Sequence, residues 1–94
     1  MMRQTPDPEI IALRALAFIA SDEDTMGGFL GRCGADIETV RTRAKDPEFL
    51  GFVLDHLMAE DESVIAFASA EGLDPTQVVE ARAALPGGDT PNWT

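Results

Sequence analysis

The stretch DPEFLGFVLDHLMAE, from Asp46 to Glu60, holds a dense group of large apolar residues. It opens with an Asp-Pro pair, which is typical of a helix start because aspartate caps free N–H groups and proline fits the first turn. The apolar residues spread too widely around a helix to form one narrow stripe, so several neighbours must cover them. They are Phe49, Leu50, Phe52, Val53, Leu54, Leu57 and Met58. The sequence therefore predicts a central helix over residues 46–60, shorter than the about 20 apolar residues that cross a bilayer.

Helix start and stop signals recur on both sides of this stretch. Asp7-Pro8 and Asp74-Pro75 repeat the start signal, Asp36 is a third capping aspartate, and Gly34 predicts a left-handed helix end. The predicted helices cover residues 8–20, 25–33, 37–45, 46–60, 64–72 and 75–85. We therefore expect an all-α fold of about six short helices. A single domain spans residues 7–86, between a disordered N-terminus at 1–6 and a flexible tail at 87–94.

The first and second halves of the sequence also resemble each other at an offset of 38 or 39 residues. An offset of 39 places Asp7-Pro8-Glu9 on Asp46-Pro47-Glu48, and an offset of 38 places Phe29 on Phe67 and Gly34 on Gly72. This pattern predicts two tandem copies of a trihelical, helix-turn-helix-like unit, over about 7–45 and 46–85. The two units would pack about a pseudo-twofold axis, with the first and central helices as the inner pair. The alternative is a chance likeness between amphipathic helices that share Asp-Pro caps.

The charge balance disfavours several classes of partner. Seventeen acidic residues face seven lysines and arginines, for a formal net charge of −10. This field repels nucleic-acid phosphates and anionic lipid headgroups, so the sequence predicts no membrane binding and disfavours nucleic acid. Cys33 is the single cysteine, and the N-terminus carries no secretory signal pattern. We therefore expect a cytoplasmic protein without disulfides.

No constellation of residues predicts chemistry. His56, the single histidine, lacks a partner at metal-ligand spacing, and it points about 100° away from its neighbour Asp55 on a helix. We therefore expect His56 to be a half-buried packing residue and Cys33 a buried one. The acidic runs at 22–24 and 60–62 lack the ligand pattern of a calcium loop. The sequence thus predicts no catalytic residues, no cofactor and no metal, and we expect no enzyme.

Glycines are concentrated in the second predicted helix. Gly27, Gly28 and Gly31 each weaken that helix by about 1 kcal/mol relative to alanine. Their spacing suggests a close helix crossing, or a face on which the backbone of a partner could approach. Together with Trp93 in the tail, these glycines are the candidate partner contacts.

The segment FASAEGLDPTQV, residues 67–78, resembles the helix-turn-helix of bacterial repressors. In a DNA-binding interpretation, the third helix would present Arg41, Arg43 and Lys45 to the nucleic acid. Apart from these three residues, the sequence has only 7 − 3 = 4 lysines and arginines against 17 acidic residues. Such a chain has little positive surface for phosphates, so DNA binding is the alternative rather than the leading interpretation.

The order of these features resembles a known family. The apolar first helix, the acidic break, the start DPEFL at 46–50 and the close FASAEGLDP at 67–75 are similar to a bacterial family of short acidic all-helical proteins, domain of unknown function 3572. The resemblance covers about residues 8–85 and implies a cytoplasmic all-helical protein, with no functional residues to carry over. The leading hypothesis is a non-enzymatic interaction module that binds itself as a homodimer or binds another protein. The alternatives are a degenerate DNA-binding regulator and an enzyme with an unrecognised pocket.

Overall fold

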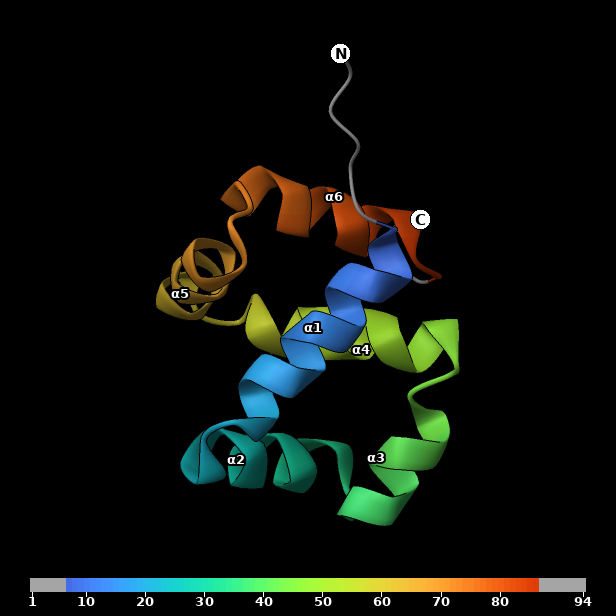
Figure 1. The fold of residues 1–94 in the computed structure, drawn as a ribbon. Helices are drawn as coiled ribbons and strands as arrows, with labels where there is room; N and C mark the ends of the chain where they lie inside the picture. The colour runs from blue at the N-terminus through green and yellow to red at the C-terminus, as the bar shows by residue number, and fades with distance from the viewer. Residues whose placement is uncertain (1–6, 87–94) are drawn as a thin grey trace, which may run out of the picture.

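A computed structural model describes residues 7–86, which form six helices and no strand. The helices are α1 (Pro8–Ala20), α2 (Glu23–Cys33), α3 (Ile37–Arg43), α4 (Pro47–Leu57), α5 (Asp61–Glu71) and α6 (Pro75–Ala84). In Figure 1, α1 crosses in front of α4 at the centre of the molecule. Helices α5 and α6 lie on one side of this crossing, and α2 and α3 lie on the other. The predicted all-α fold is confirmed.

The predicted capping aspartates begin four of the six helices. Asp7, Asp36, Asp46 and Asp74 each accept a hydrogen bond from a backbone N–H in the first turn of the helix that follows. Asp74 forms the fullest cap, because the Gln77 side chain also accepts a bond from the Asp74 N–H at 2.8 Å. These local bonds fix the helix starts at the residues that the sequence indicates.

Four predicted boundaries shift by a few residues. Helix α5 begins at Asp61, three residues before the predicted start at 64, with Glu60 as its N-cap residue. Helix α2 begins two residues earlier than predicted, because Asp22 caps it through the N–H and hydroxyl of Thr25. Helix α4 ends at Leu57 rather than Glu60, where the Ala59 N–H turns back to the carbonyl of His56. Helix α3 ends at Arg43 in a similar turn, in which the Asp46 N–H bonds to the Arg43 carbonyl.

The core lies between α1 and α4. Helix α4 buries six residues, more than any other helix in the described part of the chain, which agrees with its predicted central place. Phe29 from α2 and Phe67 from α5 are fully buried. The ring of Phe29 packs at an angle on Phe49 and Phe52 of α4, and the ring of Phe67 packs edge-on against Phe18 of α1.

Several positions paired by the predicted repeat have the same local structure. Gly34 and Gly72 both end a helix in the left-handed conformation, with φ of 64° and 69°. Phe29 and Phe67 are both fully buried. The two sides of the core nevertheless differ: α3 buries only Val40, whereas α6 buries Val78 and Ala81. The duplication itself stays a prediction.

The predicted close helix crossing at the glycines of α2 is wrong. Gly27, Gly28 and Gly31 are exposed, and a Cβ atom added to any of them would meet no atom within 4 Å. The glycine that does permit a close approach is Gly51 of α4, which is buried. A Cβ atom there would lie 2.6 Å from Nη1 of Arg82.

Candidate functional site

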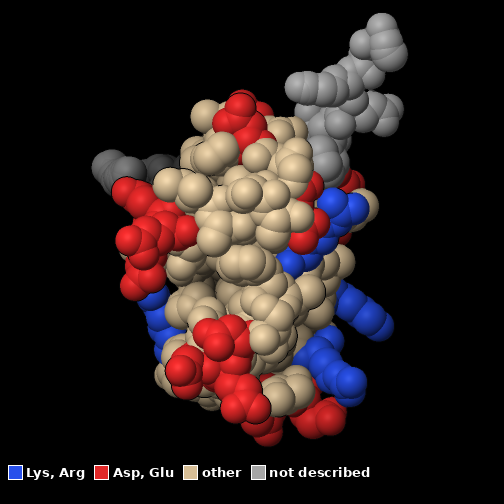
Figure 2. Space-filling model, turned by 60° about the vertical axis from the view of Figure 1, so that its left-hand side comes forward, with Lys and Arg blue, Asp and Glu red and all other residues tan. Residues whose placement is uncertain are grey.

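A groove with a volume of about 630 Å³ lies between the end of α1, one face of α2, the end of α4 and the start of α5. These helix ends lie on the left-hand side of Figure 1, which comes forward in Figure 2. That view shows uncharged surface over the middle of this face, acidic side chains at its lower and left-hand borders and at the top, and basic side chains at the lower left and along the right-hand border. We refer to this recess as the α2–α5 groove.

The floor of the α2–α5 groove is apolar, and its rim is acidic. The apolar lining comes from Phe18, Ile19, Leu57, Ala59 and Ala66. Four acidic residues line it from the starts of two helices: Asp22, Asp24, Glu60 and Glu62. Arg32 is the single arginine or lysine in the lining. Counting these residues as charged gives 1 − 4 = −3 around the groove.

His56 lines the same groove and is half-buried, as predicted. Its ring packs edge-on against Phe29, with 5.1 Å between ring centroids. Its Nδ1 atom is buried and has no hydrogen-bond partner among the described residues. Burial first, and then the nearby charge of Arg32, lowers the pKa of His56 below its usual value, while Glu60 acts in the opposite direction. The imidazole is therefore neutral near pH 7 and does not offset the acidic rim.

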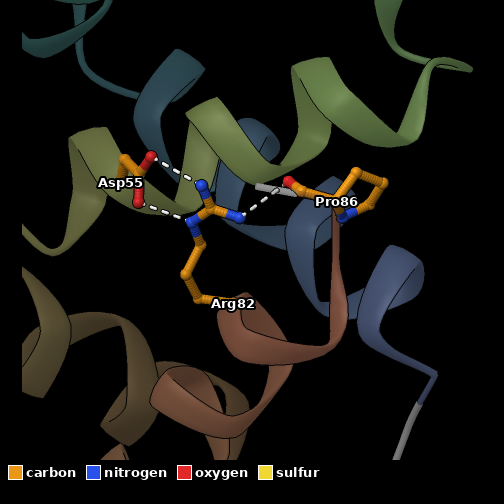
Figure 3. Close-up of polar contacts among 3 residues, drawn as sticks. All are labelled: Asp55, Arg82 and Pro86. Carbon is orange, nitrogen blue, oxygen red and sulfur yellow. Dashed lines mark hydrogen bonds and ion pairs between the residues drawn. The ribbon is translucent and has the colours of Figure 1, made fainter. Parts of the chain in front are cut away.

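Asp55, the neighbour of His56, points to a different partner. Its carboxylate accepts two hydrogen bonds from Arg82 of α6, and Figure 3 shows the guanidinium lying between Asp55 and Pro86. The third bond of this guanidinium runs from Nη1 to the Pro86 carbonyl at 3.1 Å. The side chain of Arg82 is 14% exposed. This cluster ties α6 to α4 and leaves Asp55 with a structural role, so it forms no acid–base pair with His56.

The structure places the predicted contact residues at separate locations. Gly28 lines the α2–α5 groove, whereas Gly27 and Gly31 lie on the exposed surface of α2 outside its lining. Trp93 lies outside the described residues. Cys33 is half-buried against the core rather than fully buried, and its Sγ points to the Leu30 carbonyl at 3.8 Å.

The three cations of the DNA-binding alternative are all exposed. Arg41 and Arg43 lie on α3, and Lys45 follows it. Within residues 7–86 the ion pairs are Arg14 with Glu71 and Arg82 with Asp55, so none of these three cations is neutralised by a described neighbour.

A further surface was not singled out from the sequence. Helix α1 is apolar almost all round, with Glu9 and Arg14 as its charged residues, yet it buries only one face. The opposite face carries exposed residues at helical spacing, namely Ile10, Leu13, Ala17 and Ala20. Ile10 is 46% exposed and Leu13 is 43% exposed. We call this set the α1 stripe. The apolar pattern of α1 was visible in the sequence, but it does not reveal which face the other helices leave open.

Comparison with known protein families identifies the family of this chain. The family described as protein of unknown function DUF3572 matches residues 5–88. The chain belongs to this family. No curated protein and no solved structure matches the chain significantly. The family resemblance expected from the sequence is thus confirmed, and the description of DUF3572 assigns no activity that could be carried over.

The described part of this DUF3572 chain also sets limits on metal and membrane sites. Within residues 7–86, no group of three or more histidine, cysteine or acidic residues could hold a metal ion. None of the helices in this range is both long and apolar enough to cross a membrane. The α2–α5 groove, the α1 stripe and the cations of α3 are the surface features of this DUF3572 structure considered below.

Proposed function

We propose that the protein is a non-enzymatic interaction module that associates with a second copy of itself through the α1 stripe. The observation that carries this proposal is the open apolar face of α1. A helix that is apolar all round is normally covered on all sides, because burying apolar surface is the main favourable term in association. Here Ile10 and Leu13 are nearly half exposed.

The α1 stripe is self-complementary when two copies run antiparallel. Its first half carries the large residues Ile10 and Leu13, and its second half carries the small residues Ala17 and Ala20. Antiparallel pairing about a twofold axis places Ile10 opposite Ala20 and Leu13 opposite Ala17. Large side chains then face small ones at every position, which allows two helices to approach closely.

Charge and size limit the strength of this dimer. Each copy carries a net charge of −10, so the copies repel each other, and added salt should strengthen their association by screening. One helix face is also small against the roughly 800 Å² per partner that stable complexes bury. We therefore expect association between micromolar and millimolar protein concentration rather than a permanent dimer.

Sedimentation or light scattering over this concentration range tests the proposal. Leu13→Glu should abolish association, because it places a charge in the paired face. Val79→Glu is the matched control, since Val79 is a 51% exposed apolar residue on α6 outside the stripe. A wild-type chain that stays monomeric at millimolar concentration, or equal effects of both variants, would contradict the proposal.

A size exchange tests the antiparallel pairing itself. Ala17→Leu adds apolar surface but places leucine against Leu13 of the second copy, so it should weaken association. The double variant Leu13→Ala with Ala17→Leu restores one large and one small residue at each contact, and it should restore association. A surface that is merely sticky would instead associate more strongly after Ala17→Leu alone.

The exposed cations of α3 support a second candidate, the DNA-binding regulator. Arg41, Arg43 and Lys45 are not neutralised within the described residues, so they could contact phosphates. Repeating the sedimentation with a short random duplex at low salt separates the candidates. Binding that falls steeply with salt and is lost on changing all three cations to glutamine would favour DNA binding.

A further inference from the structure

The α2–α5 groove has features that self-association does not use. Its floor is apolar, and four acidic residues from two helix starts stand around that floor. None of these four carboxylates forms an ion pair within residues 7–86. Glu60 is the N-cap residue of α5, yet its side chain forms no capping bond, so its carboxylate is free for another partner.

The charge around the groove favours a ligand of positive charge. The groove carries four carboxylates against the single arginine Arg32, within a chain of net charge −10. An anionic ligand would be repelled by both the rim and the whole protein. A cationic ligand would be attracted by both, and it would relieve the repulsion among the four carboxylates.

The apolar floor favours a ligand that has an apolar face as well as a positive charge. A small cation has no apolar surface to place against Phe18, Ala59 and Ala66, and no described group of residues could hold a metal ion. A peptide helix with one apolar face and one basic face presents both complements at once. Gly28 helps to make room for it, because this position carries no side chain on the groove-facing side of α2.

We propose that the α2–α5 groove binds a cationic amphipathic segment of another protein, with apolar side chains on the groove floor and lysine or arginine side chains beside Asp22, Asp24, Glu60 and Glu62. This site is separate from the α1 stripe, so the two interactions can succeed or fail independently. Added salt distinguishes them further, since it should weaken this binding and strengthen self-association.

A labelled amphipathic peptide of leucine and lysine, about 14 residues long, is a suitable probe, with fluorescence anisotropy as the readout. The measurement uses the whole chain at a concentration where sedimentation finds a monomer. We expect saturable binding that weakens about tenfold or more between about 50 and about 300 mM salt. A peptide of lysine with serine in place of leucine should bind at least about tenfold more weakly, because it lacks the apolar face.

Two neighbouring glycines give a variant and a matched control. Gly28→Leu fills the groove, and Gly27→Leu places the same side chain on the same helix outside the groove lining. Neither position has an atom within 4 Å of an added Cβ atom, and leucine favours a helix more than glycine does. Both variants should therefore fold, as thermal denaturation can verify. Gly28→Leu should weaken peptide binding about tenfold or more, and Gly27→Leu should change it less than about twofold.

A second pair of variants separates the rim from the overall charge. The triple variant Asp24→Asn, Glu60→Gln, Glu62→Gln removes three charges from the groove, and Glu38→Gln, Glu48→Gln, Glu80→Gln removes three exposed charges elsewhere. The first should weaken binding clearly more than the second. Equal weakening by both triple variants, equal affinity of the serine peptide, or unchanged binding by Gly28→Leu would each overturn the proposal.

Discussion

Substituting alanine for Gly51 should destabilise the protein, although alanine favours a helix more than glycine does. Gly51 is buried in α4, and an added Cβ atom would lie 2.6 Å from Nη1 of Arg82 and 3.1 Å from both its Cζ atom and the Pro86 carbonyl oxygen. The guanidinium must therefore move. It would then lose its two bonds to Asp55, which join α6 to α4, and its bond to the carbonyl of Pro86, which follows α6.

The expected magnitude follows from two opposing contributions. Replacing glycine by alanine within a helix stabilises by about 1 kcal/mol. The Arg82 bonds to Asp55 contribute about 1 kcal/mol after allowing for solvent screening, because the Asp55 side chain is 46% exposed, and the bond to Pro86 contributes about 1 kcal/mol more. The net effect of Gly51→Ala should be a loss of about 1 kcal/mol, or about 5 °C in melting temperature for a domain of this size.

Urea and thermal denaturation, followed by circular dichroism, measure this effect. Arg82→Ala removes the nearest obstacle and leaves the Pro86 carbonyl oxygen, which lies at 3.1 Å and without its bond to Arg82 can shift by the few tenths of an ångström needed. In that background Gly51→Ala should therefore stabilise, by up to about 1 kcal/mol, which reverses its sign. Gly31→Ala is the matched control, because Gly31 is exposed with no atom near an added Cβ atom, and it should stabilise in both backgrounds. If Gly51→Ala stabilises the wild-type chain as much as Gly31→Ala does, the close approach of Arg82 is refuted.

Two further predictions concern a turn and a titrating group. Gly72→Ala should cost about 1 kcal/mol because Gly72 has a φ of 69°, whereas Gly72→Asn should cost less since asparagine tolerates this conformation; equal denaturation midpoints for the two variants would contradict this reason. The pKa of His56 is lowered from its ordinary value of 6.5, mainly by burial and then by Arg32, so the unfolded chain takes up the proton first as the pH falls. The free energy of unfolding of the wild type, minus that of His56→Gln, should therefore be largest above pH 6.5 and decrease as the pH falls through the lowered pKa. A difference that stays constant, or that grows toward acid pH, would contradict this prediction.

The parts of the fold that were predictable from sequence are set by neighbours along the chain. Asp7, Asp36, Asp46 and Asp74 cap helices through bonds to residues two or three positions away, and Gly72 ends α5 in the conformation that glycine adopts without strain. Each of these features needs only a short stretch of sequence. The central place of 46–60 was predictable for a different reason, because its apolar residues cover too much of the helix circumference for one neighbour to bury.

The candidate sites were less predictable because they depend on residues far apart in the chain. Arg82 meets Asp55 across 27 positions, and neither residue belongs to a local pattern. The glycine pattern of α2 predicted Gly27, Gly28 and Gly31 together as contacts, whereas only Gly28 lines the groove. The groove requires α1, α2, α4 and α5 to be placed together. Two residues from each acidic run, at 22–24 and 60–62, line this one recess, which the sequence alone does not show.

The Arg82 cluster also gives a physical reason why the two sides of the core differ. At the offsets of the predicted repeat, Gly51 corresponds to Ala12, Asp55 to Leu16 and Arg82 to Ala44. These three residues cannot form the ion pair that ties α6 to α4. Helix α3 is accordingly held by one buried residue, Val40, and leaves Ile37 55% exposed. If the chain arose by duplication, the second unit has a polar attachment that the first lacks, and α3 is free to carry exposed cations because the fold requires so little of its surface.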